Sequence, residues 1–530
     1  MSAPHTFPLD SEPHTSVIIA GAGLSGLDAL VQLKRLAKVT DVVCYEKGDG
    51  LGGTWRSNRY PGASCDIPIA FYSFSFEPAK EFATQWPDSE GICRYYDRVV
   101  DKYGVRDQFV FHTVVEEARF SRDTGLWTIR IRNVTTDETR NKTANVFISA
   151  VGALSTPADP PFDVSNFDGK VMHSAAWDTS VDLNDKNVVV VGNGCSAAQI
   201  VPALLPEVKS LTQIARNKHA IVAPNQIPNN PLTNGIVRYV PGLHTLFRLG
   251  IFQVCEGYFG LTDKEKGAEG RKKIKQESER YIEKTAPEKY WDQLKFDFDF
   301  GMKRRIIDFS SYTPSLHSPK FSLLLPDTIA SAKGHTVRTE KGVDVDADVI
   351  VLATGFKVTD YLFPLTVYNS EGASLIKRLK GNGVKTYLTS MIASYPNFFI
   401  LMGPNSVTGH SSALFNTECT VEMMIQLLKP VFVSLRAPSA ESAPFLEVTQ
   451  EAEDEWYAAM REEMEKKVWE QDGGISWYVD PEQGKCTTLF PWNQLVFQRQ
   501  TRDIKKERFV WTGLIGGSKP TLMQRLSMSQ

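Results

Sequence analysis

Two glycine-rich turns are the parts of this chain best suited to do chemistry, because each could hold the phosphates of a dinucleotide. The first, Gly21-Ala-Gly-Leu-Ser-Gly26, is a GxGxxG motif between the apolar run 16–20 and an expected helix. In such a unit the first glycine makes the tight turn, Gly23 lets a pyrophosphate approach the backbone, and Gly26 lets helix meet strand. Glu46 ends the next apolar run, where a carboxylate would hold a ribose. This combination predicts a dinucleotide site, whereas the motif alone would also suit a plain surface turn.

The second turn, Gly192-Asn-Gly-Cys-Ser-Ala197, has alanine in the third place and follows the apolar run 187–191. The residue after the next apolar run is Arg216, where an NAD site would carry an acid. Because a guanidinium suits a 2′-phosphate, this turn is predicted to bind NADP. The alternative is that Arg216 is a surface arginine at the end of a strand.

Two dinucleotide sites in one chain imply that one dinucleotide passes a hydride to the other, and a flavin is the usual acceptor. The chain is therefore predicted to be a flavoprotein that uses NADPH, with FAD and NADP as cofactors. Its seven cysteines are odd in number and include no CxxC pair, which argues against a disulfide framework, a metal site and a redox-active dithiol. Reduced thiols and a cytoplasmic location are expected, and a disulfide reductase is excluded.

A stretch just before the second turn resembles the fingerprint of a known family. Phe167-Asp-Gly-Lys-Val-Met-His173-Ser-Ala-Ala-Trp177-Asp178 is similar to FxGxxxHxxxW(P/D) of the flavin-dependent (type I) Baeyer–Villiger monooxygenases. Flavin monooxygenases that oxygenate nitrogen or sulfur resemble this pattern only as far as the histidine. Further stretches resemble the same family in the same order, and they are Gly52-Gly53-Thr54-Trp55, Arg59-Tyr-Pro-Gly-Ala-Ser-Cys-Asp66, Lys303-Arg304, Ala353-Thr354-Gly355-Phe356 and Gly403-Pro-Asn-Ser-Val-Thr-Gly-His410.

The resemblance implies two sets of cofactor contacts and one catalytic pair. The residues it implies around FAD are Gly21, Gly23, Gly26, Glu46, Gly53, Thr54, Trp55, Asp66, Tyr72 and Val115. Those it implies around NADP are Gly192, Gly194, Ser196, Arg216 and Lys303. In the family the arginine of the Lys-Arg pair lies over the flavin, so Arg304 is the catalytic candidate and Asp66 the carboxylate that positions it.

The chemistry of the reaction also calls for a fixed cation, independently of the family resemblance. Oxygen adds to reduced flavin to give a peroxide whose anion must attack a ketone carbonyl, and both the peroxide and the resulting alkoxide are anions that a guanidinium stabilises. The alternative for Arg304 is a solvated member of the basic cluster 303–305. His173, a lone histidine near a domain hinge, is expected to have a linker role.

The chain departs from the family pattern at three places. The family often has arginine where this chain has Ser64, and often proline where it has Arg305. Ser476-Trp477-Tyr478 resembles a Ser-Trp pair that contacts the nicotinamide in many members, but the sequence that follows differs. Trp477 is therefore a candidate cofactor contact. Because this loop shapes the active-site lid in the family, the substrate preference of this chain is expected to be unusual.

The elements that position these residues predict an α/β fold with two Rossmann-like dinucleotide-binding domains, one for FAD and one for NADP. Residues 1–155 are expected to form the first part of the FAD domain. Residues 156–330 are expected to form the NADP domain, with a helical insertion at about 225–300. This insertion is expected to pack over a substrate cavity, and the alternative is that its apolar part is a membrane-surface patch. Residues 331–530 are expected to complete the FAD domain and to supply C-terminal lid segments.

Composition sets the outer limits. The chain has 530 residues, 42% of them apolar, and a net charge of −3, with no single-sign run longer than a few positions. Several globular domains are therefore expected, and no nucleic-acid partner. No apolar stretch reaches the roughly 18–20 residues needed to span a bilayer. The predicted activity is NADPH- and oxygen-dependent conversion of a ketone to an ester or lactone through a flavin peroxide. The alternatives are oxygenation of nitrogen or sulfur, and a non-catalytic nucleotide-binding flavoprotein; the oligomeric state is not indicated.

Overall fold

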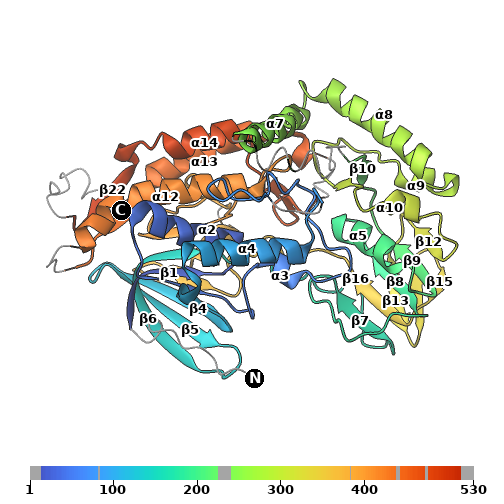
Figure 1. The fold of residues 1–530 in the computed structure, drawn as a ribbon, viewed down its shortest axis with the longest axis horizontal. Coiled ribbons are helices and arrows are strands. Elements are labelled where there is room, and N and C mark those ends of the chain that lie inside the picture. The colour runs from blue at the N-terminus through green and yellow to red at the C-terminus, as the bar shows by residue number, and fades with distance from the viewer. Residues whose placement is uncertain are drawn as a thin grey trace.

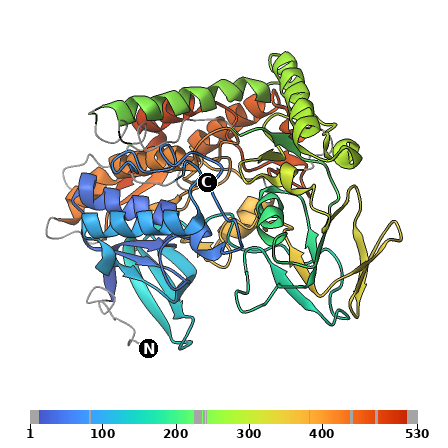
Figure 2. The same ribbon diagram turned by 45° about the vertical axis from the view of Figure 1, so that its right-hand side comes forward.

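The chain folds into two Rossmann-like units that lie side by side, with a layer of helices above them (Figures 1 and 2). The computed structural model describes residues 13–80, 84–224, 235, 240, 242–381, 383–436, 442–471 and 476–514. Each unit is a largely parallel sheet with a glycine turn at the end of its first strand. The predicted α/β class with two such units is confirmed.

The first unit is built on a sheet of strand order β17-β4-β5-β6-β1-β2-β3, with β18 also paired to β6. β6, β1, β2, β3 and β18 are parallel, whereas β4, β5 and β6 form an antiparallel meander. β1 is a continuous apolar run because it is covered on both faces, as expected for a central parallel strand. The strands are β1 (His14–Ala20), β2 (Val42–Tyr45), β3 (Phe109–Val110), β4 (Thr113–Ser121), β5 (Leu126–Asn133), β6 (Thr139–Ser149), β17 (Thr366–Tyr368) and β18 (Phe398–Ile400).

The second unit has a parallel sheet of strand order β12-β9-β8-β16-β7. Its strands are β7 (Lys170–His173), β8 (Asn187–Val191), β9 (Ser210–Ile214), β12 (Phe321–Leu324) and β16 (Val349–Leu352). The parallel pair β10 (Ala220–Val222) and β11 (Arg305–Ile307) lies beside this sheet, and β13 (Ile329–Lys333), β14 (Thr336–Thr339) and β15 (Asp344–Asp346) form an antiparallel meander.

The strand order differs from the predicted division of the chain after residue 330. β16 lies between β8 and β7 in the second sheet, so the second unit continues at least to Leu352. The return to the first unit comes with β17 and β18, which pair with β4 and β6. Sequence order could not indicate this, because the edge and central places of a strand are set by long-range pairing.

Most helices of the first unit pack above its sheet. They are α2 (Leu24–Gln32), η1 (Leu33–Ala37), α3 (Thr54–Ser57), α4 (Ser89–Tyr103), η2 (Arg106–Gln108), α11 (Leu375–Gly381), α12 (Ala413–Leu435), α13 (Gln450–Met464), η5 (Val468–Glu470), α14 (Gln494–Arg502) and η7 (Lys506–Arg508). The C-terminal part also has the antiparallel pairs β19 (Phe445–Val448) with β22 (Phe509–Thr512), and β20 (Val479–Asp480) with β21 (Lys485–Cys486).

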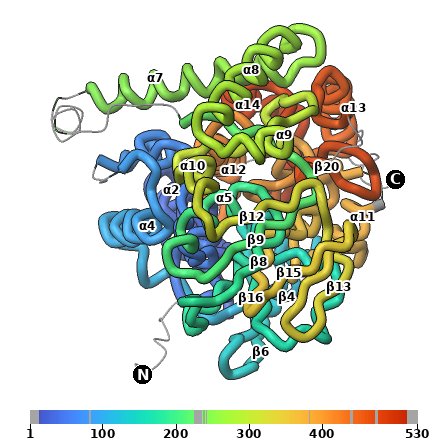
Figure 3. Tube along the Cα trace, turned by 90° about the vertical axis from the view of Figure 1, so that its right-hand side faces the viewer, coloured from blue at the N-terminus to red at the C-terminus, as the bar shows by residue number. Residues whose placement is uncertain are grey.

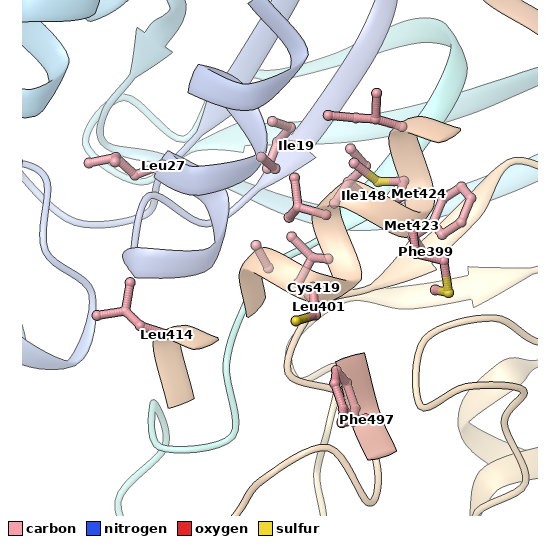
Figure 4. Close-up of a cluster of buried hydrophobic side chains, with 14 of the residues drawn as sticks. Ile19, Leu27, Ile148, Phe399, Leu401, Leu414, Cys419, Met423, Met424 and Phe497 are labelled. Atoms are coloured by element: carbon pink, nitrogen blue, oxygen red, sulfur yellow. The ribbon is translucent and has the colours of Figure 1, made fainter. Parts of the chain in front are cut away.

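Polar residues begin several of these helices, and an apolar core joins them to the sheet. Asp88, Thr449 and Asn493 cap α4, α13 and α14 by accepting hydrogen bonds from the first turn of each helix. In the core the side chains of α2, β1, β6, β18, α12 and α14 meet, so the N-terminal and C-terminal parts of the unit share one interior (Figure 4). The second unit contributes α5 (Cys195–Leu204) and α10 (Tyr312–Ser315).

The described part of the predicted insertion is helical and connects the two units. It comprises α7 (Leu243–Gly257), η3 (Tyr258–Thr262), α8 (Ala268–Thr285), η4 (Glu288–Tyr290) and α9 (Trp291–Leu294), while residues 225–234, 236–239 and 241 lie outside the described part. α7 belongs by contact to the first unit, where Phe252 lies 5.9 Å from Phe71 and 5.4 Å from Phe415 between ring centroids. α8 instead packs on the second unit, with Ile282 in its core (Figures 1 and 3).

Within the described residues, no helix is long and apolar enough to cross a membrane. All seven cysteines of the chain are free thiols.

The docking of α7 predicts a large loss of stability for Phe252→Ala. Phe252 is only 7% exposed, and deleting a buried phenylalanine ring costs about 3–5 kcal/mol. Val254, on the same helix, is 53% exposed, so Val254→Ala should change the free energy of unfolding by less than about 0.5 kcal/mol. Urea-induced unfolding followed by tryptophan fluorescence measures both. Equal midpoints for the two variants would contradict this packing.

Candidate active site

The first glycine of each turn lies against a carbonyl at the end of the neighbouring strand. A Cβ added to Gly21 would lie 2.5 Å from the oxygen of Ala150, and one added to Gly192 would collide with the oxygen of Ala353. Both glycines have positive φ, +105° and +113° respectively. Glycine is therefore required for each turn to cross the carboxyl end of its sheet, which is where open α/β sheets bind nucleotides.

The rest of the first turn also fits a dinucleotide. A Cβ on Gly26 would overlap the oxygen of Gly21, so helix α2 can begin this close to the strand only with glycine here. Glu46 steadies the turn, because its Oε2 accepts a hydrogen bond from the Ala22 N–H at 2.8 Å and its Oε1 one from Gly48 at 2.7 Å. Each carboxylate oxygen keeps a further lone pair that a ribose hydroxyl could use.

A second loop comes close to this turn. A Cβ on Gly53, which has a φ of +54°, would lie 2.8 Å from the Cα of Gly23, so the two backbones touch. Thr54 begins α3 directly after this contact. Trp55 donates a hydrogen bond from Nε1 to the Tyr72 hydroxyl at 3.0 Å, and the rings meet edge to face at 5.8 Å. The structure thus brings these residues, which were predicted to contact FAD, together around the first glycine turn.

Two other predicted contacts have different surroundings. Val115 lies in β4 with its side chain buried in the core of the sheet, so any cofactor contact there would come from its main chain. Trp477 is 43% exposed, with its ring 4.5 Å from that of Tyr478. Residues 472–475, directly before this segment, lie outside the described residues. The role of Trp477 stays a prediction.

The predicted NADP residues are grouped around the second turn. Gly194 precedes α5, and Ser196 lies in its first turn. Arg216 follows β9 and is exposed, which leaves its guanidinium available to a phosphate. Lys218, two residues on, has its Nζ 3.6 Å from Oδ2 of Asp297.

His219 lies beside the second glycine turn, and sequence reasoning missed it. Its Nε2 would lie 3.9 Å from a Cβ added to Gly194, so the ring faces the second turn. Burial, together with the nearby charge of Arg304, lowers the pKa of His219 to about 4. The imidazole is therefore neutral at physiological pH. Its position three residues after Arg216 was the available indication in the sequence.

Lys303, predicted to lie beside NADP, is buried in the structure, and its role at the cofactor stays a prediction. Its side chain is 2% exposed, and its Nζ donates a hydrogen bond to the carbonyl of Val468 at 3.1 Å. The neighbouring Gly301 packs so tightly on Val468 that a Cβ there would collide with it. The ammonium group is consequently directed into the C-terminal segment of the first unit, away from Arg216.

Asp66, predicted to position Arg304, forms an ion pair with the next arginine, Arg305. Nη2 of Arg305 lies 2.9 Å from Oδ2 of Asp66, whereas the Arg304 guanidinium lies 3.5 Å from the ring centroid of Phe298. Arg304 has a positive φ of 48°, and Arg305 is the first residue of β11. Consecutive side chains therefore leave the backbone on different sides, and the Arg305 side chain faces Asp66 of the first unit.

The Arg305 guanidinium is held at the junction of the two units. Nη1 donates to the carbonyl of Gly409 at 3.3 Å, and the side chain is 14% exposed. Burial alone would lower the pKa of Arg305, but the Asp66 carboxylate together with the nearby Tyr478 and Cys195 outweighs it, and the pKa is raised. The Cys195 thiol donates to the Arg305 carbonyl at 3.2 Å, which joins this strand to the start of α5.

Gln199 of α5 fixes the loop that carries Asp66, and sequence reasoning missed it too. Its Oε1 accepts from the Tyr60 hydroxyl at 2.8 Å and from the Ser64 N–H at 3.3 Å, and its Nε2 donates to the Ser64 carbonyl at 2.9 Å. Gly62, with a φ of +85°, lies against the Gln199 carbonyl, where a Cβ would be 2.7 Å away. Helix α5 of the second unit thus fixes the loop of the first unit that carries Asp66.

His173 lies at the end of β7, beside Leu352 of β16. Its Nδ1 accepts a hydrogen bond from the Ala175 N–H at 3.0 Å, and its ring lies 6.1 Å from that of Phe356. Burial lowers the pKa of His173. The chain continues from His173 to β8 of the same sheet, so the linker role of His173 stays a prediction.

Comparison with known families matches two parts of the chain. Residues 19–86 match a family model described as an NAD(P)-binding Rossmann-like domain. Residues 94–240 match one described as L-lysine 6-monooxygenase/L-ornithine 5-monooxygenase.

Curated relatives match almost the whole chain. A Baeyer-Villiger monooxygenase of Streptomyces coelicolor is 31% identical over 501 residues, which cover 93% of this chain and 91% of that protein. The chain belongs to the Baeyer–Villiger monooxygenases. A second relative of that name, from Pseudomonas aeruginosa, is 29% identical over 92% of this chain and 90% of its own length.

Solved structures have the same fold as this Baeyer–Villiger monooxygenase. Cyclohexanone monooxygenase from Rhodococcus sp. Phi1 bound to NADP+ matches with a TM-score of 0.79 at 23% identity, covering 94% of this chain and 99% of the other. Oxidized steroid monooxygenase bound to NADP matches with a TM-score of 0.80 at 24% identity, over 94% and 100%. Membership makes the chain an FAD-containing, NADPH-dependent enzyme, as predicted, and favours this activity over the two alternatives.

The first turn predicts that Gly26→Ala yields a protein without flavin. The added methyl would overlap the Gly21 oxygen, so the turn must open where the pyrophosphate would bind. The matched control is Gly257→Ala, because a Cβ there meets nothing within 4 Å. Absorbance of the purified variants near the flavin bands, against total protein, measures the result. Normal flavin content in Gly26→Ala would exclude this turn as the flavin site.

Proposed function

We propose that this Baeyer–Villiger monooxygenase converts a ketone to an ester or lactone, with NADPH and molecular oxygen, at the junction of its two units. The Asp66–Arg305 pair carries the proposal, because it fixes a cation between the two glycine turns. Related structures are described as cyclohexanone-bound and epsilon-caprolactone-bound, which supports a ketone substrate and a lactone product.

FAD would be held by Gly21, Gly23, Gly26, Glu46 and the Gly53–Trp55 loop, and NADP by Gly192, Gly194, Ser196 and Arg216. When bound, the two cofactors supply the electrons and the activated oxygen. The chain's own contribution is to orient the ketone and to stabilise charge.

Arg305 takes the catalytic role that the sequence suggested for Arg304. As the carbonyl carbon is attacked, its oxygen gains negative charge, and a guanidinium already fixed in a water-poor junction stabilises that charge without reorganising. Asp66 and the Gly409 carbonyl occupy two edges of this guanidinium and hold its plane. Because a guanidinium stays protonated at any working pH, the cation is permanent.

A panel of ketones tests the function itself. Incubation with NADPH and cyclohexanone, 2-octanone or acetophenone should give an ester or lactone from at least one of them, detected by gas chromatography with oxygen-18 incorporated from labelled O₂. An enzyme that oxygenates nitrogen or sulfur would instead convert an amine or thioether and leave all three ketones intact. A binding protein would not consume NADPH.

The two neighbouring arginines provide a matched pair of variants. Arg305→Ala should lower ester formation by roughly 100- to 1,000-fold, the loss expected for one preorganised donor to an oxyanion. Arg304→Ala should remain within about 10-fold of the parent, because its guanidinium lies on the Phe298 ring whereas Asp66 pairs with Arg305. Arg305→Ala should still oxidise NADPH slowly and release hydrogen peroxide. The reverse order of losses would return the catalytic role to Arg304.

Arg216 should determine the choice of nicotinamide cofactor. Removing one charge-assisted hydrogen bond in Arg216→Ala should raise KM for NADPH by about 10-fold or more, with KM for NADH nearly unchanged. Arg280→Ala, which removes an exposed arginine on α8, is the control and should alter neither. Steady-state kinetics with both cofactors measures this, and equal weakening of both would contradict the assignment.

A further inference from the structure

Helix α7 turns its two charged side chains inward. Arg248 donates hydrogen bonds to the Ser73 hydroxyl at 2.9 Å and to the Ala70 carbonyl, near the start of the helix. Glu256 lies two turns later, one residue before the end, with its side chain 9% exposed. A charge removed from water in this way is retained only with specific partners.

The partners of Glu256 come from two segments of the first unit. Its Oε1 lies 2.9 Å from Nε2 of His410, whose side chain is 2% exposed, and its Oε2 accepts from the Gln494 N–H at 3.1 Å. The His410 ring also lies 5.2 Å from that of Phe259, directly after α7. One carboxylate thus joins the insertion to the loop before α12 and to the start of α14.

These contacts enclose the carbonyl that holds the catalytic arginine. Gly409, which accepts from Nη1 of Arg305, is preceded by Thr408 and followed by His410. His410 is held by Glu256, and the Thr408 hydroxyl accepts from Nε2 of Gln494 at 3.2 Å. A Cβ on Gly409 would lie 3.2 Å from the Tyr478 hydroxyl, so the loop has little room on its other side.

We infer that Glu256 is a positioning residue for the oxygenation step, which acts through His410 and the Gly409 carbonyl on the guanidinium of Arg305. The inference rests on the catalytic role proposed above for Arg305. It assigns a function to the insertion, because α7 then sets the orientation of a cation that lies in the other unit. Without the carboxylate, His410 would lose its hydrogen bond directly beside Gly409, and the guanidinium would be free to turn about Asp66.

Glu256→Gln tests this, with Glu269→Gln as the matched control. Glu269 lies in the same insertion, 82% exposed, and pairs with Lys273 one turn away. In Glu256→Gln the share of consumed NADPH recovered as ester, from the best-converted of the three ketones named above, should fall about 5- to 10-fold while hydrogen peroxide rises. Flavin content and flavin reduction by NADPH should stay at parent values. Amide hydrogen exchange of a peptide covering residues 403–412 should be faster than in Glu269→Gln.

Double variants separate this inference from the proposed function. If Glu256 acts through Arg305, adding Glu256→Gln to Arg305→Ala should lower the remaining ester share no further. His410→Gln, which keeps a donor for the carboxylate, should retain more product than His410→Ala. Normal coupling and exchange in Glu256→Gln, with Arg305→Ala inactive, would overturn the inference and leave the proposed function standing. Full activity in Arg305→Ala would overturn both, and an additive loss in the double variant would overturn the path through Arg305.

Discussion

A single ion pair, Asp66 with Arg305, is the contact on which the arrangement of the site depends. One partner comes from each unit, and both are partly withdrawn from water, with side chains 30% and 14% exposed. Separating them would leave a charge without a partner in the junction, which is far more costly than losing an exposed pair. The pair therefore favours the docked arrangement of the units, and the same docking places a fixed cation between the two nucleotide crevices.

The first glycine of each turn is required for the same steric reason in both units. Gly21 and Gly192 each pass over a carbonyl that ends a neighbouring parallel strand, β6 in one sheet and β16 in the other. This requirement explains why the second unit needs β16 beside β8 although the two strands are far apart in sequence. The two units therefore share one arrangement, in which a glycine turn crosses the end of a neighbouring parallel strand.

Local patterns in the sequence predicted the turns, because a GxGxxG motif between an apolar run and a helix leaves few other conformations. The runs 16–20 and 187–191 are indeed β1 and β8. Contacts that depend on long-range pairing were not accessible in this way. The strand β16 was assigned across a wrong boundary, and three consecutive basic residues at 303–305 gave no indication of which one faces Asp66. That choice is made by the positive φ of Arg304, and Lys303 is withdrawn by its contact with Val468.

The insertion shows how a segment can belong to one unit by sequence and to the other by packing. α7 has Phe252 in the core of the first unit, while α8 places Ile282 in the core of the second, and only η3 and a short turn separate them. Any change in the angle between the units must therefore be absorbed near residues 257–267, or be transmitted to α7. Because α7 ends at the carboxylate that holds His410, the path inferred from Glu256 to Arg305 would link the orientation of this guanidinium to the docking of the units.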